Sequence, residues 1–144
     1  MILPHWKGRK LSAAILLIIL LLGVFAIYVR LAPIDAARWH VPVTVAEDKD
    51  LAGGVFRVIS MESDTLQKLD QIALQSPRTT RVAGSPKDGH VTYMSRSRWM
   101  GFPDFTTAQV VDGELRLYAR LRFGKADLGV NKTRVETWLA LLKK

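Results

Sequence analysis

The 144-residue chain contains no cysteine and only three histidines, and both shortages narrow its chemistry. Without cysteine it has no disulfide, no thiol for lipid attachment and no cysteine-rich zinc site. His5, His40 and His90 lie far apart in the sequence, so no pair of them has the spacing of metal ligands. Glycine-rich phosphate loops and nucleophile-elbow motifs are absent too. The sequence therefore predicts no metal site, no cofactor and no catalytic residue, although a triad of Ser85, His90 and Asp104 stays open as an alternative.

The chain does have a long apolar run, from Leu11 to Val29. As a helix rising about 1.5 Å per residue, the run is roughly 30 Å long, which is the thickness of a bilayer's hydrocarbon core. It is longer than the core of a secretory signal, and no clear Ala-x-Ala cleavage site follows it. We therefore expect an uncleaved transmembrane anchor over residues 11–30.

The orientation of this anchor follows from the basic residues before it. These are Lys7, Arg9 and Lys10. By the positive-inside rule they place the N-terminal tail, residues 1–10, in the cytoplasm. The remainder of the chain is then expected on the periplasmic side of a bacterial inner membrane.

After the anchor we expect an extended connector over residues 31–52 and one soluble α+β domain over residues 53–144. Pro33 and Pro42 disfavour helix in the connector. The chain has a net charge of +8, and the part after residue 59 is clearly basic. Such a domain suits phosphate-bearing lipid headgroups or acidic protein partners, whereas tethering outside the cytoplasm argues against nucleic acid.

The pattern of the domain predicts a small antiparallel sheet of four to five strands, with one helix before it and a C-terminal helix covering one face. Strand-like segments occupy residues 55–59, 79–83, 91–99, 104–111 and 114–123. Ser63 or Asp64 is expected to cap the first helix, with Gln67 placed to complete a capping box from Asp64. The last helix has Asn131 or Thr133 as its cap. The buried stripes at helical spacing are Leu66, Leu69, Ile72 and Ala73, then Val135, Trp138, Leu139 and Leu142.

Three segments of the chain resemble one known family. They are Thr80–Ser85, Ser95–Arg98 and, above all, Arg122–Glu136 with its Gly-x-x-Asp-Leu-Gly-Val-Asn sequence. These segments look like the uncharacterised bacterial and plastid family catalogued as domain of unknown function 1499, over roughly residues 55–142. Members of that family often carry an N-terminal anchor or export signal. The family has no established activity, so the resemblance supports the domain boundaries and leaves the function open.

An arginine-rich strand face is the main candidate binding site. Side chains two apart in a strand share a face. The residues concerned are Arg96 and Arg98 on one strand, and Arg116, Tyr118, Arg120 and Arg122 on the last. If these strands are neighbours, their guanidinium groups form one patch suited to phosphate or carboxylate. The alternative is a solvated face with scattered counterions.

The family motif invites a second, structural interpretation. Its polar and glycine positions are Gly124, Asp127, Gly129, Asn131, Arg134 and Glu136. A ligand could sit before the helix that follows, where free backbone N–H groups favour anions. We favour instead a structural role, in which Asp127 accepts backbone hydrogen bonds, Gly129 supplies a positive φ and Asn131 caps the helix.

The leading hypothesis is a non-enzymatic, membrane-anchored interaction protein. It would be an accessory or assembly subunit of a larger integral inner-membrane complex, such as an energy-transducing one. The alternative is a periplasmic-face module that binds anionic lipid headgroups, or another phosphate-bearing ligand, through the arginine face. A third hypothesis, an enzyme acting at Asp127 and Asn131, has no catalytic motif to support it.

Overall fold

The computed structural model describes residues 6–144 and divides into two compact units, one ending at Pro33 and the other running from Ile34 to Lys144. The first unit is helix α1, Trp6–Leu31. Over Arg9–Leu31 it is long and apolar enough to cross a membrane, judged by length and composition. Part of the N-terminal tail expected over residues 1–10 lies outside the described residues, and the rest belongs to α1.

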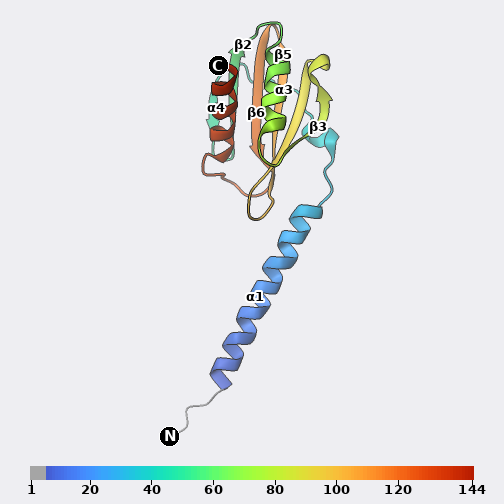
Figure 1. Ribbon diagram of the computed structural model, residues 1–144. Coiled ribbons are helices and arrows are strands. Elements are labelled where there is room, and N and C mark those ends of the chain that lie inside the picture. Colours follow the sequence, from blue (N-terminus) through green and yellow to red (C-terminus); the bar gives the residue numbers. More distant parts are fainter. Residues whose placement is uncertain (1–5) are drawn as a thin grey trace. The chain divides into compact units, whose positions relative to one another are not determined.

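The second unit is a six-stranded antiparallel sheet with two helices on one face (Figure 1). Its elements are α2 (Ala36–Trp39), β1 (Lys49–Leu51), β2 (Gly54–Ser60), α3 (Thr65–Gln75), β3 (Thr79–Ser85), the 3-10 turn η1 (Pro86–Asp88), β4 (His90–Arg96), β5 (Pro103–Val111), β6 (Glu114–Leu121) and α4 (Val130–Leu142). The strand order is β1-β2-β6-β5-β4-β3. The α+β prediction is confirmed, with six strands in place of four or five because β1 adds an edge strand to β2.

The core lies between the sheet and the helices α3 and α4. Its largest fully buried side chains are Trp138 and Tyr93, whose rings meet edge to face with centroids 5.7 Å apart. The apolar stripes predicted for both helices face this core. The tight turn at Asp112 and Gly113 has φ values of 53° and 78°, as a type I′ hairpin requires.

The capping box predicted at the start of α3 is wrong. Asp64 precedes the helix but makes no side-chain cap hydrogen bond with it or with Gln67. Its carboxylate instead pairs with Lys68 at 3.0 Å. The hydroxyl of Thr65 accepts a 2.9 Å hydrogen bond from the backbone N–H of Glu62 and so organises this turn in its place.

The connector expected over residues 31–52 is partly folded into the domain. It contains α2 and β1, and the residues after α2 cross the sheet face that the helices leave open, which we call the second face. The Trp39 ring stacks on Phe105 with centroids 4.0 Å apart. The backbone N–H of Val43 donates to the Gln109 side chain at 2.7 Å. The connector therefore packs on the second face and shields part of it from solvent.

Candidate functional site

The arginines of β6 lie on the second face and already have partners there. Arg120 is 9% exposed and donates hydrogen bonds to the carbonyl groups of Trp39 and Tyr118. Burial lowers the pKa of the Arg120 guanidinium. Arg116 pairs with Glu114 at 3.2 Å, and its side chain is only 12% exposed. Both groups are therefore engaged within the domain.

The five arginines do not form one patch, because the two strands that were expected to carry them are not neighbours. Strand β5 lies between β4 and β6. Arg96 ends β4 and donates to the Gly101 carbonyl at 2.9 Å. Arg98 lies in the next loop, with its guanidinium 5.1 Å from the centre of the Trp99 ring. Arg122 follows the last residue of β6, so these arginines separate into different environments.

The family motif forms the N-terminal cap of α4. The two carboxylate oxygens of Asp127 accept hydrogen bonds from the backbone N–H groups of Gly129 (3.0 Å) and Asn131 (2.9 Å). Gly129 has the positive φ expected of it, 80°. Asn131 and Thr133 lie inside the helix, so the prediction that one of them caps it is wrong. Because Asp127 occupies the helix N-terminus, an anion has no vacant place there.

The motif also holds a buried polar cluster. Asn131, fully buried, accepts a 2.7 Å hydrogen bond from Arg134 through its side-chain oxygen. Arg134 lies 3.6 Å from Asp104 of β5, and the two side chains are 16% and 14% exposed. Burial raises the pKa of Asp104, although Arg134 opposes that effect. The arginine is thereby held in a fixed position at the end of the sheet.

Glu136 of the motif belongs to a separate ion-pair network, between α4 and the strands β1 and β2. Arg57 of β2 pairs with Glu136 at 2.7 Å and with Asp50 of β1 at 2.8 Å. Asp50 also pairs with Lys132 at 2.5 Å. Hydrogen bonds from Lys132 and Arg57 lower the pKa of Asp50. The network joins α4 to β1 and β2.

Gly124, the first motif position, lies in the loop before α4 with a φ of 97°.

A hollow of about 400 Å³ lies where the α3–β3 link, the end of β4 and the first turns of α4 meet. Its basic lining residues, which we call the arginine pocket, are Arg78, Arg96, Arg98 and Arg134. The hydroxyl groups of Ser97 and Thr137 also line it. Among residues 6–144, no carboxylate lies within ion-pair distance of Arg78 or Arg98. The hollow thus has a surplus of positive charge.

Sequence reasoning found this pocket only in part. The sequence predicts Arg96 and Arg98 on a strand face and Arg134 in the family motif, and it does not bring the three together. Arg78 was missed, because it lies in a link between elements where no periodicity identifies it. Its backbone φ of 56° is an unusual value for a residue other than glycine. Its Nε donates to the Arg96 carbonyl at 3.1 Å, which fixes it beside the end of β4.

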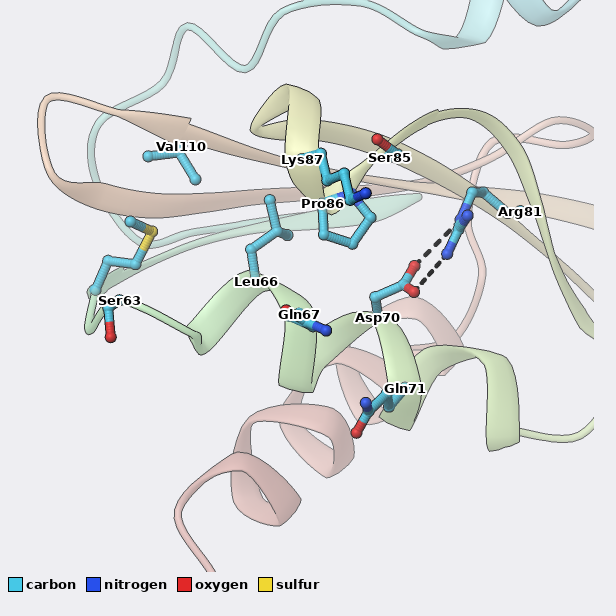
Figure 2. A pocket seen from close by; sticks show the side chains of 11 residues that line it. Ser63, Leu66, Gln67, Asp70, Gln71, Arg81, Ser85, Pro86, Lys87 and Val110 are labelled. Carbon is cyan, nitrogen blue, oxygen red and sulfur yellow. Dashed lines mark hydrogen bonds and ion pairs between the residues drawn. The ribbon is translucent and has the colours of Figure 1, made fainter.

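A second hollow of similar size lies between α3 and the β3–η1 segment, and Figure 2 shows Asp70 facing Arg81 across it. Asp70 pairs with Arg81 at 2.5 Å and accepts a 2.9 Å hydrogen bond from the Tyr93 hydroxyl. Burial and the Asp70 hydrogen bond raise the pKa of Tyr93. The lining has one carboxylate, Asp70, against the basic side chains of Arg81 and Lys87, so its surplus of positive charge is smaller than that of the arginine pocket.

The triad that the sequence left open is not assembled. Ser85 donates to Asp88 at 2.7 Å. His90 pairs with Gln109 in the sheet register, whereas Asp104 lies at the opposite end of β5. Within residues 6–144, no group of three or more His, Cys, Asp or Glu side chains could hold a metal ion.

Comparison with known proteins agrees with the resemblance seen in the motifs. A family model described as "Protein of unknown function (DUF1499)" matches residues 39–142. The match begins at Trp39, so it includes the connector segment on the second face and extends further than the motifs alone indicate. No curated protein sequence matches the chain.

Proposed function

The chain belongs to the DUF1499 family, and because that family carries no assigned function, we propose one from the arginine pocket. In this proposal the protein is a single-pass membrane protein, and its domain binds a phosphate-bearing anion, foremost the headgroup of an anionic lipid. One observation carries the proposal. Arg78 and Arg98 line the same hollow, and neither has a carboxylate partner within residues 6–144. Helix α1 would supply the anchor, and the basic residues at its N-terminal end, before the apolar run, favour a periplasmic domain.

The chemistry of the pocket suits phosphate. A planar guanidinium group donates two parallel hydrogen bonds to phosphate oxygens, and several such groups around one hollow match its charge. Arg134 is already oriented by Asn131 and Asp104. Burial, together with the positive charge of Arg78, lowers the pKa of Arg134. An anion between these two arginines would relieve their repulsion, which favours binding of negative charge at this point.

Titration of the full-length protein in neutral detergent with glycerol phosphate tests the proposal. The heat of binding in isothermal titration calorimetry is the readout, because Trp99 is one of four tryptophans and Arg98, which stands over its ring, is itself substituted in the test variant. We expect a saturable change that weakens with salt, and its loss in the double variant Arg78→Gln, Arg98→Gln. The matched control, Lys87→Gln with Lys143→Gln, removes the same charge away from this pocket and should keep the response. Equal losses in both variants would show that only net charge matters and would refute the pocket.

A second candidate, an accessory subunit of an inner-membrane complex, is supported by α1. Its consecutive apolar side chains from Ile15 to Leu22 are exposed, as a helix facing lipid or another transmembrane helix requires. Purification of the tagged full-length protein in mild detergent, beside a variant with an unrelated anchor, tests this candidate. A stoichiometric complex that disappears on exchange of the anchor would support it. Recovery of the protein alone from both would count against it.

A further inference from the structure

We propose that the end of the sheet next to the arginine pocket docks on the bilayer that holds the anchor. Trp99 and Leu128 would enter the interfacial region, and the pocket would hold the phosphate of an anionic lipid. This inference rests on the anion binding proposed above and adds the surface that meets the membrane. We call the two loops concerned, residues 97–102 and 122–129, the tip.

Both loops leave the sheet at the same end (Figure 1). Arg96 at the end of β4 pairs with Pro103 at the start of β5. Leu121 at the end of β6 pairs with Asp104, the next residue of β5. The loop after β4 and the loop after β6 therefore emerge side by side, and Arg78 precedes β3 at this end too, because Thr79 pairs with Ser95.

The tip and the first turn of α4 carry the most exposed large apolar side chains of the second unit. They are Leu128 (98% exposed), Trp99 (79%) and Val130 (51%). Single exposed apolar side chains are common, but a group of them beside one another marks an interaction surface. Tryptophan is favoured at the membrane–water interface, where its ring meets both lipid and water.

The backbone at Leu128 supports a use for its side chain. Leu128 has a φ of 54°, in the left-handed region that glycine and asparagine occupy with less strain. A leucine that is almost fully exposed gains no packing to offset this strain. Strained positions of this kind are common at functional sites, and insertion into lipid would bury the apolar side chain of Leu128.

Charge identifies the occupant as an anionic bilayer. Arg78, Arg98 and Lys125 accompany the apolar side chains, and this combination of basic and apolar groups is typical of surfaces that bind anionic membranes. The link to the anchor also favours a bilayer. Only residues 32–35 separate α1 from α2, and they span at most about 14 Å when extended. A domain on so short a link stays next to the headgroups of its own membrane.

A single introduced thiol tests the proposal, because the natural chain has no cysteine. Leu128→Cys carries an environment-sensitive dye at the tip, and its exposure means that no buried packing is lost. Leu141→Cys, at a residue 44% exposed near the C-terminal end of α4, is the matched control. Each full-length variant is placed in nanodiscs of phosphatidylcholine, with or without phosphatidylglycerol, and lipid-borne spin labels serve as quenchers.

We expect blue-shifted, lipid-quenched emission from the dye at residue 128 in phosphatidylglycerol discs, weakening with salt. The dye at residue 141 should report water in both kinds of disc. Adding Arg78→Gln or Arg98→Gln should lower the ratio of docked to undocked domain about five-fold for each charge removed. Emission typical of water at residue 128 in phosphatidylglycerol discs would overturn the proposal. Equal quenching at both residues would overturn it too.

The outcomes separate docking from anion binding. If glycerol phosphate binds the pocket while the dye at residue 128 stays in water, docking is overturned and the proposed function stands. If the dye enters lipid equally with and without phosphatidylglycerol, and the arginine variants change nothing, the part played by an anionic headgroup is overturned.

Discussion

Replacing Trp39 with alanine tests whether the segment between anchor and sheet is part of the folded domain. The Trp39 ring lies nearly parallel to that of Phe105, with an angle of 9° and centroids 4.0 Å apart. The Arg120 guanidinium stands 5.4 Å from the centre of the same ring. Phe105 is 0% exposed, so the substitution would open its ring to water.

The magnitude follows from the half-buried state of Trp39. Truncating a fully buried tryptophan to alanine costs about 3–5 kcal/mol, and half of that is about 2 kcal/mol. Loss of the ring stacking adds about 1 kcal/mol. The Trp39 carbonyl stays in place and still accepts from Arg120. We therefore expect the free energy of unfolding to fall by about 3 kcal/mol and Tm to fall by roughly 12 °C, at about 4 °C per kcal/mol for a domain of this size.

Calorimetry of the full-length protein in detergent micelles measures this change. Trp99→Ala is the matched control, since it removes the same side chain from a position that is 79% exposed. Its effect should stay within about 0.5 kcal/mol, as for other surface substitutions. If both variants unfold at the same temperature, the connector contributes nothing to packing and the reasoning is refuted.

Further predictions concern single groups. Tyr93→Phe removes the hydrogen bond to Asp70 and should cost about 1 kcal/mol, whereas Asp70→Ala leaves the buried hydroxyl of Tyr93 unpaired and should cost about 3 kcal/mol in urea unfolding. Burial and the neighbouring His40 lower the pKa of His90 below its usual 6.5, so the unfolded state binds more protons under acidic conditions. The free energy of unfolding should therefore fall as the pH drops below about 6.5, and His90→Gln should reduce this slope. Leu128→Asn should leave the free energy of unfolding unchanged or raise it by up to about 1 kcal/mol, because asparagine tolerates a positive φ, as thermal unfolding would show.

The sequence predicts those parts of the fold in which buried residues recur at the regular spacing of a strand or a helix. Leu115 and Leu117 alternate with polar residues, a pattern that predicts one buried face, and both side chains are fully buried. Their neighbour Arg120 was placed on a wet or binding face, yet it is 9% exposed. The reason is a carbonyl group from Trp39, far away in the chain, and alternation within one strand carries no information about such a contact.

The candidate site was harder to predict than the fold, since it depends on how elements approach one another. Arg78 and Arg98 belong to different links, and they line one hollow only because β3 and β4 pair and α4 packs beside them. The prediction of the residue that caps α4 is wrong for a more local reason. Asp127 accepts hydrogen bonds from the backbone N–H of Gly129, just before the helix, and of Asn131 in its first turn, so a residue three positions before the helix caps it.

The side of the membrane on which the domain lies can be tested with the same single-cysteine chains. The basic residues before the apolar run favour a periplasmic domain, but Arg30 and Arg38 follow the run and weaken that asymmetry. A membrane-impermeant maleimide added to intact cells should label Leu141→Cys fully. It should label Leu128→Cys more slowly, because lipid covers the tip. If neither cysteine reacts until the cells are opened, the domain is cytoplasmic. The arginines of the tip would then face the anionic inner leaflet, where the same docking chemistry would hold and only the orientation would be reversed.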